Sequence, residues 1–328
     1  MATYQSRISQ NILYAFLTTY ILFGSSLRAQ QAWAPYQRQL WFRPAFVHSE
    51  YNSAYLANAY AKYDDNVRIT AGAATFEYGI TDRLTLDASS GFGKLGRHRI
   101  FNPLNPFRPQ TPESPDKYGV LDSRAGIRYR IVDEFDSKYR WMPTISVRVG
   151  GIKKGDYDRN PQALGDGANG IEANLYFAKD FDFFGLGTIG EVSYRKRERP
   201  VPEDIVYHGS IYKRFFESIY LFTGTRGQIG QGGFGYFDPR QQPPYNLFEL
   251  KPFNDQFVWN GINLYDWYVR DFRPPWGRRE SFQNLEIGLG YMDSYGNFWN
   301  IFYSETINGF NTADLRTIGF VVNMPYNI

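Results

Sequence analysis

The sequence predicts an all-β protein: an antiparallel transmembrane β-barrel of about twelve strands, with about fourteen as the alternative count. Apolar residues recur at every second position through most of the chain, which is the period of a strand with two different faces. Aromatic residues make up 18% of the chain. No run of about 18 or more apolar residues follows residue 29, and the mean hydropathy is −0.47. A chain that spans a membrane with strands scores as polar in this way, because only every second residue faces lipid.

The first segment is interpreted as a signal peptide over residues 1–29, followed by a single barrel domain over residues 30–328. Arg7 supplies a positive charge, "NILYAFLTTYILFG" supplies an apolar core, and small residues precede a cleavage site near Ala29. A membrane-anchoring helix that is never cleaved is the alternative. Both interpretations place the chain outside the cytoplasm, and the absence of cysteine fits a protein without disulfides.

The stretch "TFEYGITDRLTLDASSGFGKLG" predicts two strands joined by a tight turn at Thr81 and Asp82. After the turn, apolar and polar residues alternate strictly. The side chains expected to face lipid are Leu84, Leu86, Ala88 and Phe92, and those expected to face the barrel interior are Thr85, Asp87 and Ser89.

The strand expected from Leu121 to Ile131 carries Arg124, Arg128 and Arg130 on one face. Three arginines cannot lie unpaired in a dry core, so this face must meet water or opposite charge. Extending the same alternation along the chain gives the candidate pore-lining residues Asp87, Asp122, Arg124, Arg128, Arg130, Arg148, Glu172, Glu191, Arg195, Arg197, Arg214 and Glu286. Two interpretations stay open: a narrow barrel filled by ion-paired side chains, and a pore lining that selects solutes.

The connections between the expected strands alternate in length. Short or moderate ones are expected at Thr81–Asp82, Asp133–Tyr139, Asp180–Phe184, Phe215–Ser218 and Ser294–Gly296, and long ones at Gly96–Lys117, Gly155–Gly170 and Gln228–Gln256. Outer-membrane barrels place short turns in the periplasm and long loops outside the cell. Aromatic residues also cluster at strand ends, which favours a membrane barrel over a soluble β-sandwich. About thirteen candidate strands are found, so either two of them merge or another lies near Tyr245–Lys251.

Several motifs are candidates for catalytic or cofactor sites. "GLGTIG" (Gly185–Gly190) has the spacing of a dinucleotide motif, but a strand pattern follows it where a helix is needed. The loop "GDYDRNPQALGDG" lacks the closing glutamate of a calcium loop, and there is no Cys/His cluster for zinc. A lipid hydrolase would need a Ser–His pair at His48 or His208, yet neighbouring residues of a strand point to opposite faces. We therefore predict no enzyme, cofactor or metal site.

Four stretches together resemble the outer-membrane barrel family named for the meta-pathway of phenol degradation: "YGITDRLTLD", "GVLDSRAGIRYRI", "MPTISVRVGGIKKGDYD" and "INGFNTADLRTIGFVVNMPY". The resemblance covers roughly Thr75–Phe215 and Asn284–Tyr326. Members of this family are regarded as transporters of hydrophobic or aromatic compounds. The resemblance implies an architecture and a broad class of solute, and it offers no catalytic residues to carry over.

These observations predict a channel in the bacterial outer membrane for passive uptake of small aromatic or anionic solutes. A ladder of arginines along one wall is expected to favour anions. The alternatives are a structural or adhesion barrel that conducts nothing, and a barrel lipid hydrolase. The expected partners are membrane lipid, a small-molecule solute and the barrel-assembly machinery during biogenesis. Nucleic acid is excluded as a partner, because a net charge of +3 supplies no extended basic field.

Overall fold

The computed structural model describes residues 33–56, 59–96, 116–136, 138–139, 141–156, 168–181, 184–198, 201–216, 218–231, 258–259, 262–263, 281–310 and 312–328. The expected signal peptide, most of the three long loops and the candidate strand near Tyr245–Lys251 lie outside these residues. Within the described part of the chain, no helix has the length and apolar character needed to cross a membrane.

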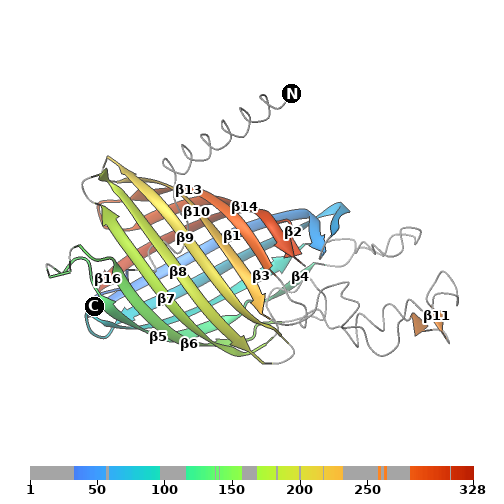
Figure 1. The fold of residues 1–328 in the computed structure, drawn as a ribbon, viewed down its shortest axis with the longest axis horizontal. Helices are drawn as coiled ribbons and strands as arrows, with labels where there is room; N and C mark the ends of the chain where they lie inside the picture. Colours follow the sequence, from blue (N-terminus) through green and yellow to red (C-terminus); the bar gives the residue numbers. More distant parts are fainter. Residues whose placement is uncertain are drawn as a thin grey trace, which may run out of the picture.

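Twelve long antiparallel strands close into a barrel (Figure 1). Neighbours in sequence pair with one another around the ring, and β1 closes it by pairing with both β2 and β16. The strands are β1 (Gln39–Leu56), β2 (Ala59–Gly79), β3 (Leu84–Leu95), β5 (Ser123–Val132), β6 (Thr144–Lys153), β7 (Gly170–Phe181), β8 (Leu186–Arg197), β9 (Glu203–Phe215), β10 (Ile219–Gln231), β13 (Ser281–Met292), β14 (Phe298–Phe310) and β16 (Arg316–Asn327). The predicted fold class and strand count are thereby confirmed.

Four shorter strands accompany the ring. β4 (Lys117–Val120) pairs with β3 and leads into β5, and β15 (Thr312–Ala313) pairs with β1 and leads into β16. Each is therefore an extension of its successor and adds no further strand to the wall. β11 (Val258–Trp259) and β12 (Ile262–Asn263) form a small separate sheet.

The two faces of the wall have the polarity expected for a membrane barrel. On β5, Ile127 is 48% exposed on the outside, whereas its neighbour Arg128 is 2% exposed and faces inward. On β3, Leu86 and Phe92 are exposed while Thr85 is buried. A soluble protein would bury the apolar face, so a sheet that exposes it requires an apolar solvent.

The turns that follow β2, β5, β7, β9 and β13 share one end of the barrel, the short-turn end (Figure 1). The ends of β3, β6 and β10, from which the three long connections depart, share the opposite end, the long-loop end, together with the short connections after β1, β8 and β14. The start of β1 and the end of β16 lie at the short-turn end, because Gln39 pairs with Asn327 and Leu40 with Tyr78.

The predicted start of the third long loop, at Gln228, was wrong. β10 continues to Gln231, and backbone pairing with β9 on one side and with β13 on the other holds this glycine-rich segment as a strand.

One short turn shows how such a connection is fixed. Between β13 and β14, Gly296 adopts a φ of 80°, and Asp293 Oδ1 accepts hydrogen bonds of 2.9 Å from the backbone amides of Tyr295 and Asn297. Partial burial opposes ionisation of Asp293, but these bonds and those from the side chains of Asn297 and Trp299 outweigh it and lower its pKa.

An aromatic cluster fills the interior near the short-turn end. It contains the buried residues Tyr176, Ala178, Ile189, Tyr212, Phe222 and Phe298, with Trp33, Tyr220 and Met292 packed against them. The segment preceding β1 lies against this cluster, with the rings of Trp33 and Tyr212 6.2 Å apart and Ala34 only 3% exposed. The barrel is therefore packed with side chains and backbone at this end.

Candidate pore lining

A cavity of about 250 Å³ lies inside the barrel, between the aromatic cluster and the long-loop end. Its lining comes from inward positions on most strands of the wall, and two aromatic residues, Tyr176 and Phe302, contribute to it. The ionisable residues that line it are Arg43, Glu77, Asp87, Asp122, Arg124, Arg128, Arg148, Glu172, Glu191, His208, Arg226 and Glu286.

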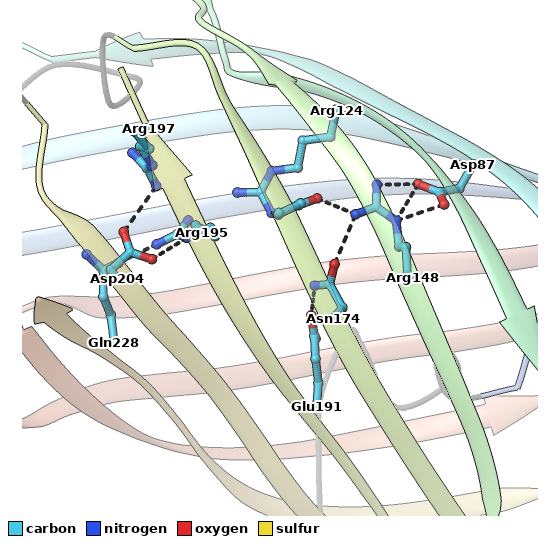
Figure 2. A network of polar contacts seen from close by, with 10 residues as sticks. Asp87, Arg124, Arg148, Asn174, Glu191, Arg195, Arg197, Asp204 and Gln228 are labelled. Carbon is cyan, nitrogen blue, oxygen red and sulfur yellow. Dashed lines mark hydrogen bonds and ion pairs between the residues drawn. The ribbon is translucent and has the colours of Figure 1, made fainter. Parts of the chain in front are cut away.

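Arg148 on β6 is the centre of one ion network (Figure 2). Its guanidinium contacts Asp87 on β3, with Nε 2.8 Å from Oδ2 and Nη2 2.6 Å from Oδ1. Its Nη1 contacts Glu172 and also donates to Asn174 Oδ1 at 3.1 Å. Arg124 Nη1 approaches Glu172 from the other side at 3.4 Å. Three strands thus place two carboxylates around one arginine, with all three side chains at most 8% exposed.

Two glycines beside Arg148 make this arrangement possible. A Cβ on Gly126 would lie 2.7 Å from Arg148 Nη2, and a Cβ on Gly150 would lie 2.9 Å from the same atom. Side chains at these inward positions would displace the guanidinium. The two glycines on the charged face therefore leave room for the large side chain of Arg148.

A second network joins β1, β2 and β5. Glu77 accepts from Arg128 Nη2 at 3.1 Å and from Arg43 Nη2 at 3.2 Å, and all three residues are at most 3% exposed. The Arg128 guanidinium also lies 4.6 Å from the centre of the Tyr176 ring. The predicted lining begins at Asp87 and lacks Arg43 and Glu77, which lie on the two preceding strands. Their alternation with Phe42, Phe46, Phe76 and Tyr78 was the available signal.

The remaining ionisable lining lies on β8, β9, β10 and β13, apart from Asp122, which precedes β5 and accepts a hydrogen bond from the backbone amide of Gly155. Glu191, His208 and Arg226 pair directly across three neighbouring strands. His208 is 4% exposed, and its Nε2 is 3.6 Å from Glu286 Oε2. The sequence had suggested His208 only as a hydrolase base, whereas the structure places it in the cavity wall.

The structure divides the predicted pore-lining residues into three groups. Asp87, Asp122, Arg124, Arg128, Arg148, Glu172, Glu191 and Glu286 line the cavity, so most of the expected set is brought together. Arg195 and Arg197 share Asp204 nearer the long-loop end, where Arg195 also donates to Gln228 at 2.8 Å (Figure 2). Arg130 and Arg214 lie at the short-turn end, outside the cavity lining. Whether solutes pass along these residues stays a prediction.

The charges that line the cavity nearly balance. Five arginines are opposed by six carboxylates, namely Arg43, Arg124, Arg128, Arg148 and Arg226 against Glu77, Asp87, Asp122, Glu172, Glu191 and Glu286. Each arginine of the expected basic ladder has a carboxylate partner at Glu77, Asp87, Asp133 or Glu172. The basis for predicting anion preference, an excess of positive charge along one wall, is therefore not present in the cavity.

At the short-turn end, Glu134 holds the segment that precedes β1. Its carboxylate accepts from Trp33 Nε1 at 3.0 Å, from Lys179 Nζ at 3.1 Å and from the backbone amide of Asp180 at 3.0 Å. Nearby, Arg130 Nη2 donates to the carbonyl of Ala34. These contacts fix the segment across the inside of the barrel end.

The same segment is held by Tyr36, whose ring stacks under Arg130 at 4.5 Å. Its hydroxyl donates to Asp133 Oδ2 at 3.1 Å. Burial and the Asp133 carboxylate raise the pKa of this hydroxyl and thereby favour its protonated, donating form.

The structure also shows the surroundings of the residues suggested for a hydrolase. His48 points outward from β1, with Nδ1 2.8 Å from Thr70 Oγ1 and Nε2 3.3 Å from Glu50 Oε1. Ser49 instead bonds Thr317 on β16 at 2.8 Å, so the local Ser–His pair is not formed. His98 lies outside the described residues. In the described part of the chain, no group of three or more His, Asp or Glu residues could hold a metal ion.

A closed antiparallel sheet with an apolar exterior and a charged interior defines the class of membrane-spanning β-barrels. Among solved structures, the chain is similar to an outer membrane channel from Pseudomonas putida F1, at 12% identity, with 89% of this chain and 97% of that one covered and a TM-score of 0.57. It is also similar to the KdgM porin, at 7% identity over 86% of this chain and 98% of that one, with a TM-score of 0.43. No family model and no curated protein matches the sequence. At these identities the likeness concerns the fold.

Proposed function

We propose that this protein is a bacterial outer-membrane channel through which small solutes move passively, without chemical change. The observation that carries the proposal is the polar cavity of about 250 Å³ enclosed by a complete barrel wall. A barrel whose interior is filled completely by ion-paired side chains would lack such a space. The fold similarity to an outer membrane channel supports the same location. Insertion by the barrel-assembly machinery is part of this proposal.

We infer that the solutes are small and contain a single aromatic ring. An apolar cavity of about 150 Å³ is sufficient to bind benzene, so the cavity here is large enough for one substituted ring. Tyr176 and Phe302 offer aromatic walls, and the next stretch toward the short-turn end is the aromatic cluster. The resemblance to the barrel family of the phenol meta-pathway supports the same class of solute. Nearly balanced charge along the lining favours neither anions nor cations strongly.

Conduction is tested directly in planar bilayers and by liposome swelling. In the parent protein, the Trp33–Tyr36 segment and the aromatic cluster narrow the short-turn end, so we expect low conductance and slow swelling. Trp33→Ala removes the ring that contacts both Glu134 and Tyr212 and should raise conductance several-fold. Trp299→Ala, which removes an outward-facing tryptophan from β14, is the matched control and should leave conductance unchanged. Absence of conductance and swelling in all three proteins would favour the structural alternative.

The solute class is tested in the same liposomes with benzoate and benzylamine, two single-ring solutes of similar size and opposite charge. Because the lining charges nearly cancel, the two swelling rates should be comparable. A strong preference for benzoate would restore the basic-ladder hypothesis, and exclusion of both solutes would contradict the proposed size class.

Orientation is tested with epitope tags on intact cells. A tag inserted after Gln231, at the long-loop end of β10, should be reachable by antibody from outside. A tag in the Asp293–Asn297 turn at the other end should be reachable only after permeabilisation. The reverse pattern of access would invert the proposed topology.

A further inference from the structure

The outer wall of the barrel carries an apolar groove of about 920 Å³ over β3, β5, β6 and β7. Its floor is formed by small outward residues, Ala88, Ala125, Gly151 and Ala173. The first three pair directly across neighbouring strands, Ala88 with Ala125 and Ala125 with Gly151. Ala88, Ala125 and Gly151 therefore form one continuous row across three strands, and Ala173 lies diagonally beside Gly151 on the next strand.

Large apolar side chains border this groove. They are Phe76, Leu86, Ile127, Val149, Ile171 and Tyr194, and each is at least 42% exposed. The groove is thus a feature of the lipid-facing surface, separated from the interior cavity by the wall itself. In a membrane its natural contents are hydrocarbon chains, since no water is present there.

Two lysines lie at the end of the groove that is nearer the long loops. Lys196 on β8 pairs with Ile171, which itself pairs with Gly151, and Lys153 follows Gly151 by two residues on the same face of β6. Lys196 is 61% exposed and lies 3.6 Å from Glu203. Lys153 is exposed and makes no ion pair with the residues that the structure describes. Lysine at the edge of an apolar band is well placed to meet an anionic head group.

We propose that this groove and the two lysines form a binding site for one anionic membrane lipid with a phosphate-bearing head group. An acyl chain lies along the small-residue floor, and the phosphate meets Lys153 and Lys196. The inference needs the barrel to lie in a membrane, but it is independent of conduction, so either can fail without the other.

The contact between the groove and the acyl chain of the lipid is tested at a matched pair of outward-facing glycines. A Cβ on Gly151 would meet only the carbonyl of Gly170 at 4.0 Å, and one on Gly209 of β9 would meet nothing within 4 Å. Both positions therefore accept a side chain without strain, but only Gly151 lines the groove. In native mass spectrometry from detergent with added phosphatidylglycerol, Gly151→Phe should bind the lipid several-fold more weakly than the parent, and Gly209→Phe should bind like the parent.

The head-group contact is tested by the Lys153→Gln/Lys196→Gln double variant. Each lysine near an anionic surface contributes about fivefold in affinity, so the double variant should lose about 25-fold. Lys94→Gln is the control, because Lys94 lies outside the groove and pairs with Asp116 at 2.7 Å. Phosphatidylcholine with the same acyl chains should bind the parent more weakly than phosphatidylglycerol. Exposed lysines are not needed for folding, so the experiment with the double lysine variant remains decisive if Gly151→Phe assembles poorly.

Three results would overturn the lipid site. They are equal binding of the two lipids by the parent, unchanged affinity in the double lysine variant, and equal losses in Gly151→Phe and Gly209→Phe. A change of oligomeric state in Gly151→Phe, with lipid retention unchanged, would assign the groove to a second copy of the chain and would also overturn the proposal.

Discussion

Ile127→Arg is expected to block assembly of the barrel. Ile127 lies near the middle of β5 and is 48% exposed on the outward face, between Leu86 on β3 and Val149 on β6. An arginine facing lipid at the bilayer midplane costs about 2–4 kcal/mol. The folded fraction should fall sharply, as measured by heat-modifiable migration on gels and by the amount of protein in the outer-membrane fraction.

The control for Ile127→Arg must place the same charge inside the barrel. Ser146 faces inward, but it is fully buried and pairs with Arg130 and Tyr176 in a space without room for arginine. Ser89 lines the cavity, where carboxylates outnumber arginines. Ser89→Arg should therefore assemble nearly as well as the parent. Equal assembly of Ile127→Arg and Ser89→Arg would mean that the two faces have been wrongly assigned.

The local alternation of residues is sufficient to predict most of the wall. Side chains of a strand alternate strictly between its two faces. Because arginine is costly in lipid, Arg128 must face the barrel interior, and its neighbour Ile127 must therefore face the membrane. Counting strands is harder, since a strand can be interrupted without leaving the wall. The alternation from Leu121 to Ile131 predicts one strand, whereas in the structure Leu121 and Asp122 separate β4 from β5, and both of these strands pair with β3. Only the pairing partners show that they form one length of wall.

The site could be predicted as a set of inward residues but not as a network. Sequence places Asp87, Arg148 and Glu172 inside the barrel, but their contact depends on the stagger of three strands, which the spacing of residues in the chain does not encode. The resulting ion pairs remove the expected excess of positive charge. The segment that crosses the short-turn end was missed for a different reason. Trp33 precedes the first strand, so no alternation marks it, and it is placed by its contacts with Glu134 and Tyr212.

Replacing Arg148 with methionine is expected to destabilise the barrel by about 3–5 kcal/mol, because removal of one partner leaves buried charge uncompensated. Asp87 and Glu172 are the carboxylates left behind, and the side chain of each is at most 8% exposed. The measurement is the free energy of unfolding in urea, followed by tryptophan fluorescence in detergent micelles. Lys196→Met removes an exposed lysine that pairs with Glu203 at 3.6 Å. That control should change the free energy by no more than about 1 kcal/mol.

The rescue variant separates loss of charge balance from loss of packing. Combining Arg148→Met with Asp87→Asn removes the carboxylate that loses its arginine, while Glu172 keeps its contact with Arg124, so most of the lost stability should return. The single variant should also shift the zero-current potential in a salt gradient toward cation preference, because the cavity lining then loses one positive charge. The double variant removes one positive and one negative charge and should return that potential to the parent value. If Arg148→Met unfolds within about 1 kcal/mol of the parent, the network is well hydrated, and the paired charges do not hold this part of the wall together.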